Sequence, residues 1–134
     1  MPHFTHDDIY DVALQVIKDD CDIMVLTEGE PTSYANCTTN NGTGSGQRVS
    51  SVAMVTGDFT LAAGDTNGRK VTCAAKSSQA ITADGDGDYV AYLDSVNTKI
   101  LHYYPIAVQR AGLTTADTVN FPAHDFEIAD KIAE

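Results

Sequence analysis

The first apolar pattern in the chain predicts an amphipathic helix over residues 5–19. Its apolar positions follow the i, i+3, i+4, i+7, i+8 spacing of one helical stripe: Ile9, Val12, Ala13, Val16 and Ile17. Thr5 is a candidate N-cap, and Asp8 stands three residues after it, as in a capping box. We expect the helix to bury this stripe against the rest of the protein.

After the helix, the apolar pattern changes to a period of two, which is typical of half-buried strands. Val71 and Cys73, for example, alternate with Lys70 and Thr72. Turn-forming residues separate the short runs, and Pro122 predicts a bend between the last two. The predicted strands cover residues 21–27, 49–56, 59–61, 69–75, 80–82, 89–94, 98–104, 118–121 and 124–128.

Residues 89–94 and 98–104 predict a hairpin that is apolar on both faces. One face can fill the core, whereas the other needs a cover from the helix or from a neighbouring subunit. The first face carries Val90, Tyr92, Ile100 and Tyr104, and the second carries Ala91, Leu93, Leu101 and Tyr103.

Together these patterns predict a mainly β protein with a β-sandwich or jelly-roll-like antiparallel core and one N-terminal amphipathic helix packed on it. The length of 134 residues favours a single domain that covers residues 1–134, with its β core over about 21–130. Residues 36–48 are rich in Asn, Thr, Gly and Ser and have no apolar period, so we expect an exposed loop or arm there.

The charge of the chain excludes two classes of partner. Acidic residues outnumber basic ones by 19 to 8, and the formal net charge is -11. Nucleic acids and anionic membranes repel such a protein, so we expect neither as a partner. The sequence also shows no secretory signal and no apolar run of membrane-spanning length, which favours synthesis in the cytoplasm.

No catalytic, cofactor-binding or metal-binding pattern is present, so we expect a protein that is not an enzyme. Asp84, Asp86 and Asp88 resemble the start of a calcium loop, but Tyr89 and Ser95 stand where an EF-hand requires Gly and Glu. A solvated hairpin tip is therefore the favoured interpretation of this acidic stretch. The four histidines are scattered and lack the spacing of metal ligands.

The three cysteines match neither a disulfide framework nor a zinc site. Cys73 alternates with apolar residues, which indicates a small core residue. Cys37 falls in the polar segment, where an exposed thiol could form an intermolecular disulfide, and Cys21 is a second candidate. The alternative is that these thiols stay reduced, as is usual in the cytoplasm.

Four segments carry a resemblance to a known family. They are EPTSYA at residues 30–35, GDTNGRKVT at 64–72, YVAYLDS at 89–95 and TVNFPAHDFEI at 118–128. In this order, after an N-terminal helix, they resemble a small virion structural protein of tailed bacteriophages. The resemblance spans nearly the whole chain and departs from it mainly at residues 36–47 and 131–134. Its motifs are structural and transfer no named functional residue.

The resemblance implies a capsid decoration (cement) protein that binds the outer head surface and stabilises the shell through protein-protein contacts. A tail, collar or fibre component, with a role in host recognition, is the alternative. The implied partners are the major capsid protein or other virion proteins, and copies of the chain itself, with a trimer favoured. The implied location is the virion, assembled in the host bacterial cytoplasm. The residues that we expect at intermolecular contacts are Cys37, Asn41, Arg48, Tyr92 and Tyr104.

Overall fold

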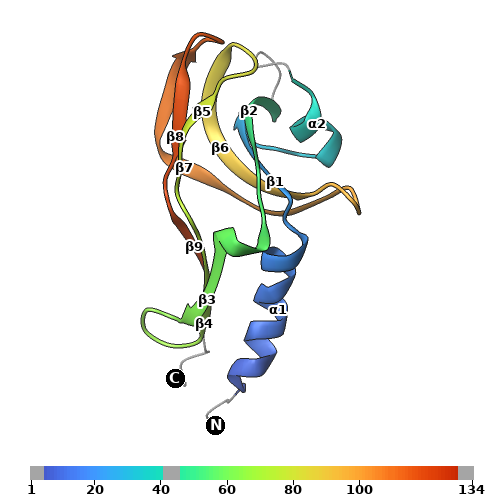
Figure 1. The fold of residues 1–134 in the computed structure, drawn as a ribbon, viewed down its shortest axis with the longest axis vertical. Helices are drawn as coiled ribbons and strands as arrows, with labels where there is room; N and C mark the ends of the chain where they lie inside the picture. The colour runs from blue at the N-terminus through green and yellow to red at the C-terminus, as the bar shows by residue number, and fades with distance from the viewer. Residues whose placement is uncertain (1–4, 41–45, 130–134) are drawn as a thin grey trace.

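The computed structural model describes residues 5–40 and 46–129, and it confirms a mainly β protein with antiparallel sheets and one long helix near the N-terminus (Figure 1). The elements, in chain order, are α1 (Asp7–Asp20), β1 (Ile23–Glu28), α2 (Tyr34–Thr38), β2 (Gln47–Ala53), the 3-10 turn η1 (Thr56–Asp58), β3 (Phe59–Ala63), β4 (Arg69–Cys73), β5 (Lys76–Ala80), β6 (Gly85–Asp94), β7 (Lys99–Leu113), β8 (Thr118–Phe121) and β9 (His124–Ile128).

The N-cap of α1 is His6, so the prediction of Thr5 was wrong by one residue. The Nδ1 atom of His6 accepts a hydrogen bond from the backbone N–H of Asp8 at 3.2 Å, which satisfies one of the free donors of the first turn. At the other end, the N–H of Cys21 still donates to the carbonyl of Ile17 at 3.1 Å, and the chain then becomes extended.

The main sheet has the strand order β2-β1-β6-β7, and all its neighbours are antiparallel. The predicted hairpin is confirmed, because β6 pairs with β7 directly. The acidic stretch that was expected at a hairpin tip instead enters β6, with Asp84 directly before the strand and Asp86 and Asp88 in it, so that prediction was wrong. The carboxylates of Asp84, Asp86 and Asp88 there accept hydrogen bonds from the backbone N–H groups of other segments.

An irregularity in the hairpin places two residues, Ile100 and Leu101, on the faces opposite to those predicted. The register of β6 and β7 shifts between Tyr92 and Leu93, and Leu93 is then paired with Ile100. Ile100 therefore packs on the same side as Leu93, while Leu101 packs with the core that contains Tyr92. Since side chains alternate along a strand, one extra residue in one strand is enough to move its neighbours to the opposite face.

The other strands form a long two-stranded ribbon that β3 widens at one end. β4 pairs with β9, and β5 pairs with β8. The register of the first pair, in which Cys73 is opposite His124, continues into the second pair, in which Lys76 is opposite Phe121. Pro122 lies in the break between β8 and β9, where its missing N–H costs no ladder hydrogen bond. A bridge between Ser50 and Ile81 links the ribbon to β2.

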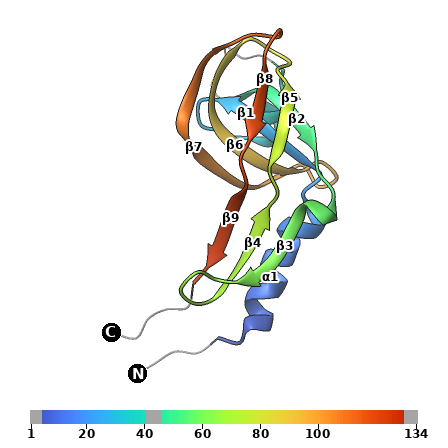
Figure 2. The same cartoon turned by 60° about the vertical axis from the view of Figure 1, so that its left-hand side comes forward.

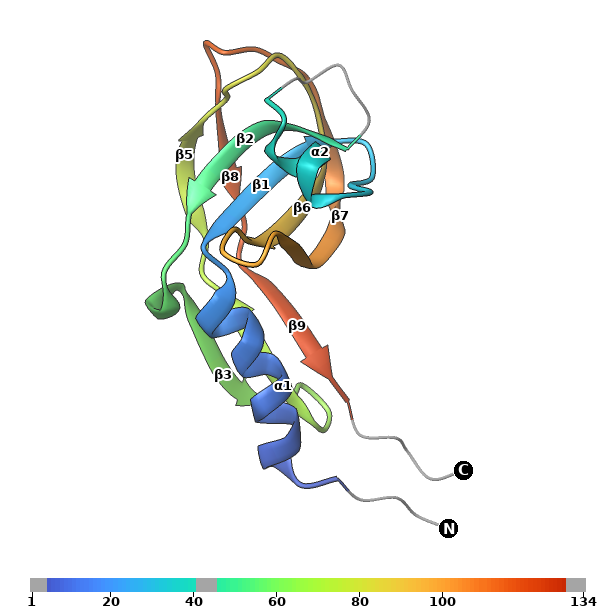
Figure 3. The same ribbon diagram turned by 90° about the vertical axis from the view of Figure 1, so that its right-hand side faces the viewer.

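The helix lies along the lower part of the ribbon, beside β3 and β4, and the main sheet curls around the upper part (Figures 2 and 3). One core runs through both parts. Its buried members come from α1, from the main sheet and from the ribbon, and include Leu14, Ile17, Met24, Tyr92, Val71 and Phe121.

The second apolar face of the main sheet has its own cover. Val25, Ala91 and Leu93 are each 0% exposed and pack with Cys37 of α2. We call this surface the α2-covered face. The segment 36–48 is therefore not a continuous loop: it contains most of α2 and the start of β2, and residues 41–45 lie outside the described residues.

Candidate interaction surface

The helix α1 has two apolar faces, and only one of them is covered. Leu14 and Ile17 are 0% and 5% exposed and belong to the core. Ile9, Val12 and Val16 are 63%, 70% and 46% exposed, although their spacing makes them one continuous row. We call this row the α1 stripe. The prediction that the helix buries a stripe of five residues was right for Ile17 and wrong for these three and for Ala13, which is also exposed.

An ion pair holds the helix in this orientation. The Nε atom of Arg69 on β4 lies 2.7 Å from Oδ1 of Asp11, and its second nitrogen donates to Oδ2 at 3.3 Å. This two-point contact has a fixed geometry that a single hydrogen bond lacks. Because Asp11 turns toward β4 together with Leu14, the stripe must point away from the protein.

Acidic side chains flank both ends of the α1 stripe. Asp7 and Asp8 stand in the first turn, and Asp19 and Asp20 in the last, and all four are exposed. Lys18 is the only basic residue in the last turn. The stripe is thus an apolar row with charged ends, which is the composition of a small interface with a polar rim.

A stack of rings joins the main sheet to the ribbon. The rings of Tyr104 on β7 and His124 on β9 lie parallel, with their centres 3.5 Å apart. The ring of His102 lies beside both, with its centre 5.6 Å from that of His124 and 5.8 Å from that of Tyr104, and the Nε2 atoms of the two histidines lie 3.4 Å apart. Burial lowers the pKa of both histidines, and the charge of His124 lowers that of His102 further. The stack therefore favours neutral imidazoles.

The structure contradicts the expectation of an exposed Cys37. This residue is 0% exposed inside the α2-covered face, and burial raises the pKa of its thiol to about 11. Cys21 is 3% exposed, and burial raises the pKa of its thiol to about 12. All three cysteines are free and buried, so an intermolecular disulfide would require the fold to open.

The other residues predicted at contacts are placed as follows. Tyr92 is 1% exposed in the core, which contradicts a contact role. Tyr104 is half-buried in the ring stack, and Arg48 is half-buried in β2, where its Nε has no hydrogen-bond partner among the described residues. Asn41 lies outside the described residues. Of the described residues in this group, Tyr92 and Tyr104 contact each other edge to face, with their ring centres 6.1 Å apart, but inside the protein. The contact roles of Arg48, Tyr104 and Asn41 stay predictions.

The surface residues that sequence reasoning missed are those of the α1 stripe. The signal for them was present, because Leu14 and Ile17 already supply a second apolar row on the same helix. A helix that packs on one sheet buries one face, so a second apolar row on another face needs a different cover or stays exposed. Among the described residues, no group of three or more His, Cys, Asp or Glu side chains could hold a metal ion.

Comparison with protein-family models, with curated proteins and with solved structures finds no match to this chain. Within residues 5–40 and 46–129, no helix has the length and apolar character needed to cross a membrane. Three of the exposed large hydrophobic residues of the described chain lie together in the α1 stripe.

Proposed function

We propose that this chain is a non-catalytic structural protein of a tailed-bacteriophage particle, where it acts as a capsid decoration protein on the outer head surface. The observation that carries the proposal is the α1 stripe: three branched apolar side chains, held outward by a fixed ion pair, in a chain of net charge -11. Such a charged protein gains nothing from exposed apolar residues in solution, whereas a protein that assembles uses them at its contacts.

The partner that we propose for the stripe is the stripe of further copies of this chain. Three copies related by a threefold axis would bring their stripes together, and this symmetry fits a threefold position of a shell. Three side chains per copy bury far less than the roughly 1,000 Å² of a stable interface. Self-association through the stripe is therefore weak in solution, and contacts with the major capsid protein would complete it on the shell by mass action.

Charge makes this association depend on salt. Each copy carries a net charge of -11, and Asp7, Asp8, Asp19 and Asp20 lie at the ends of the stripe. Like charges at these ends repel one another, and this repulsion is screened when the ionic strength rises. We expect the self-association to become stronger between low and high salt.

The test compares two exposed valines. Val12→Glu places a charge in the α1 stripe, whereas Val96→Glu places the same charge at a residue that is 84% exposed in the turn between β6 and β7. Sedimentation equilibrium at high salt and high protein concentration should show a monomer for Val12→Glu and unchanged self-association for Val96→Glu. Equal behaviour of both variants and the parent protein would contradict self-association through the stripe.

The place in the particle has its own test. Purified virions that carry this gene should contain the chain in fixed proportion to the major capsid protein, and a reconstruction should place it on the outer head surface. Density on the tail, collar or fibres would instead support the alternative component. Virions that lack the chain would contradict the proposal as a whole.

A further inference from the structure

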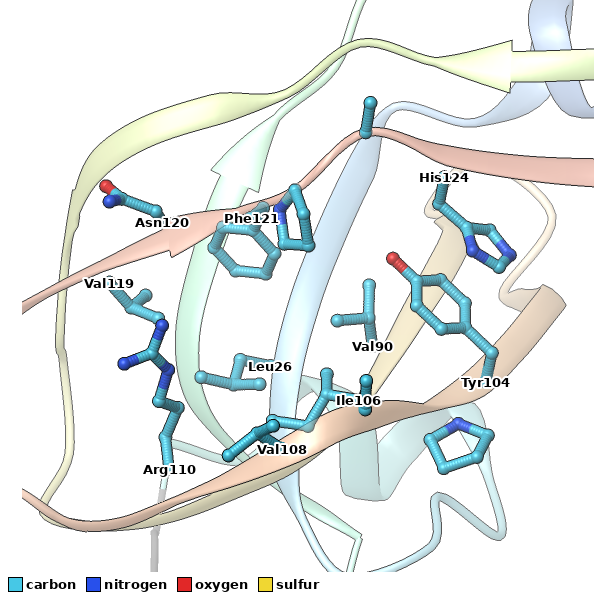
Figure 4. Close-up of a pocket in the computed structure, with 14 residues that line it drawn as sticks. Leu26, Val90, Tyr104, Ile106, Val108, Arg110, Val119, Asn120, Phe121 and His124 are labelled. Carbon is cyan, nitrogen blue, oxygen red and sulfur yellow. The ribbon is translucent and has the colours of Figure 1, made fainter.

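A cavity of about 470 Å³ lies between β7 and the β8–β9 segment (Figure 4). The main sheet forms its floor, β7 forms one wall and β8 the other. Its volume falls within the range of small-molecule sites, which are concave and mostly apolar. The apolar side chains that line it are Leu26, Val90, Ile106, Val108, Val119 and Phe121.

The cavity exists because the β-sheet does not close here. β7 is the last strand of the main sheet, and among the described strands β8 pairs with β5 alone, so each presents an edge toward the other. An added strand could in principle fill such a gap. Pro105 on β7 and Pro122 after β8 line the same cavity, and neither has an N–H to donate. These prolines favour a ligand that needs no backbone hydrogen bonds.

Apart from Asn120, whose Oδ1 accepts a hydrogen bond from the N–H of Ser78, the polar side chains that line the cavity stand at the two ends of the apolar row. Arg110 lies at one end, and Tyr104 and His124 lie at the other (Figure 4). The hydroxyl of Tyr104 is buried without a hydrogen bond of normal geometry to the described residues. A ligand of matching chemistry therefore has a long apolar part and a charged group at the end that reaches Arg110.

Arg110 is placed to receive an anion. It is paired across the hairpin with Gly87, where a Cβ would meet the side chain of Leu26 at 2.8 Å, so Leu26 of the cavity lining packs directly on this pair. The nearby carboxylates of Asp86 and Asp88 accept backbone hydrogen bonds from Gly112 and Gly29. None of the ion pairs among the described residues involves Arg110.

We propose that this cavity binds a single alkyl chain that ends in a carboxylate, with the chain along the apolar floor and the carboxylate on the guanidinium of Arg110. The local positive charge of Arg110 at one end of the apolar row carries the assignment, and it acts against the repulsion that the net charge of -11 exerts on an anion. The proposal is independent of the α1 stripe, which lies on α1 and contributes no residue to the cavity.

The test is calorimetric titration of the full chain with decanoate, below the concentration at which decanoate forms micelles. We expect a dissociation constant below about 1 mM and a tightening of about fourfold for each methylene added from hexanoate to decanoate. Arg110→Gln should weaken the binding of decanoate about tenfold and leave the binding of decanol unchanged.

Lys99→Gln is the matched control, because it removes one positive charge from the other end of β7, away from the cavity. It should leave the binding of decanoate unchanged. Val108→Glu is a second variant, at a residue that is 75% exposed. It should also weaken the binding of decanoate, because it places a negative charge at the cavity mouth. Thermal unfolding followed by circular dichroism confirms that each variant is folded.

Three results would overturn the proposal. The first is the absence of heat with decanoate, and the second is an equal loss for Arg110→Gln and Lys99→Gln. The third is sedimentation of the chain with phosphatidylglycerol vesicles, which would point to a bilayer surface instead of a free amphiphile. Val12→Glu should bind decanoate like the parent protein. The ligand proposal and the self-association proposal can therefore fail independently of each other.

Discussion

Two apolar surfaces of this protein have similar compositions, but one is buried and the other is exposed to solvent. The α2-covered face, with Val25, Ala91 and Leu93, is fully buried beneath a helix of five residues. The α1 stripe, with Ile9, Val12 and Val16, stays exposed on a helix of 14 residues. The difference does not come from the apolar residues themselves. It comes from whether another segment of the same chain is long enough and close enough to cover them.

The covering segment of the first face is local and small. Ser33 caps α2 by accepting a hydrogen bond from the N–H of Asn36 at 3.2 Å, and Cys37 then points at the sheet. The α2-covered face therefore needs no neighbouring subunit. The uncovered second face of the β6–β7 hairpin, which was one reason to expect an oligomer, no longer supports that expectation. The α1 stripe supplies a different reason, at a different place in the molecule.

The largest expected effect comes from a matched pair of valines, one in each surface. Val25→Ala should lower the free energy of unfolding by about 2 kcal/mol, because it removes buried methyl groups and leaves a cavity. Val12→Ala should change it by less than about 0.5 kcal/mol, since its side chain is 70% exposed. Urea unfolding at low protein concentration measures both. Similar losses for the two variants would mean that the α1 stripe is covered in the monomer.

The reactivity of a thiol in each surface tests the same difference in exposure. The pKa of Cys37 rises from 9.0 to about 11, so its thiolate fraction falls about a hundredfold at neutral pH. We expect slow reaction with a disulfide reagent in the native protein and rapid reaction of all three cysteines in urea. A thiol introduced by Val12→Cys should react at once in the folded protein. Fast native reaction of Cys37 would show that α2 opens readily.

The smallest expected effect is a pH dependence at the ring stack between sheet and ribbon. The pKa values of His102 and His124 are lowered in the folded protein, while in the unfolded chain they return to about 6.5. Below this pH the unfolded chain binds more protons than the folded one, so stability is complete above about pH 6.5 and falls as the pH decreases.

We expect the free energy of unfolding, measured by urea titration, to fall between pH 7 and pH 5. The carboxylate of Asp125 faces His124 and raises the pKa of that histidine, which reduces the pH dependence of the stability. His124→Phe keeps an aromatic ring at this position and should reduce the dependence. An unchanged slope in this variant would assign the effect to other groups.

The local conformation of most segments could be predicted from the sequence. The alternation in residues 118–121 and 124–128 predicted β8 and β9 with their observed bounds, and the turn residues after Asp94 predicted the hairpin of β6 and β7. The helix was predicted to within two residues. These signals are local, because a period of 2.0 or 3.6 describes how neighbouring side chains share a face.

The tertiary structure decided which faces are covered. The ion pair between Asp11 and Arg69 joins residues 58 positions apart, and it selects the face of α1 that packs on β4. The bulge beside Leu93 and the burial of Cys37 under the main sheet likewise depend on pairings between distant segments. The amino-acid pattern alone therefore determined the long helix, several apolar faces and most strands, but it placed β5 at 80–82 instead of Lys76–Ala80 and ended β7 at residue 104 instead of Leu113. Which of those faces stayed open to a partner or a ligand was decided only when the chain folded, because coverage depends on contacts that no local period contains.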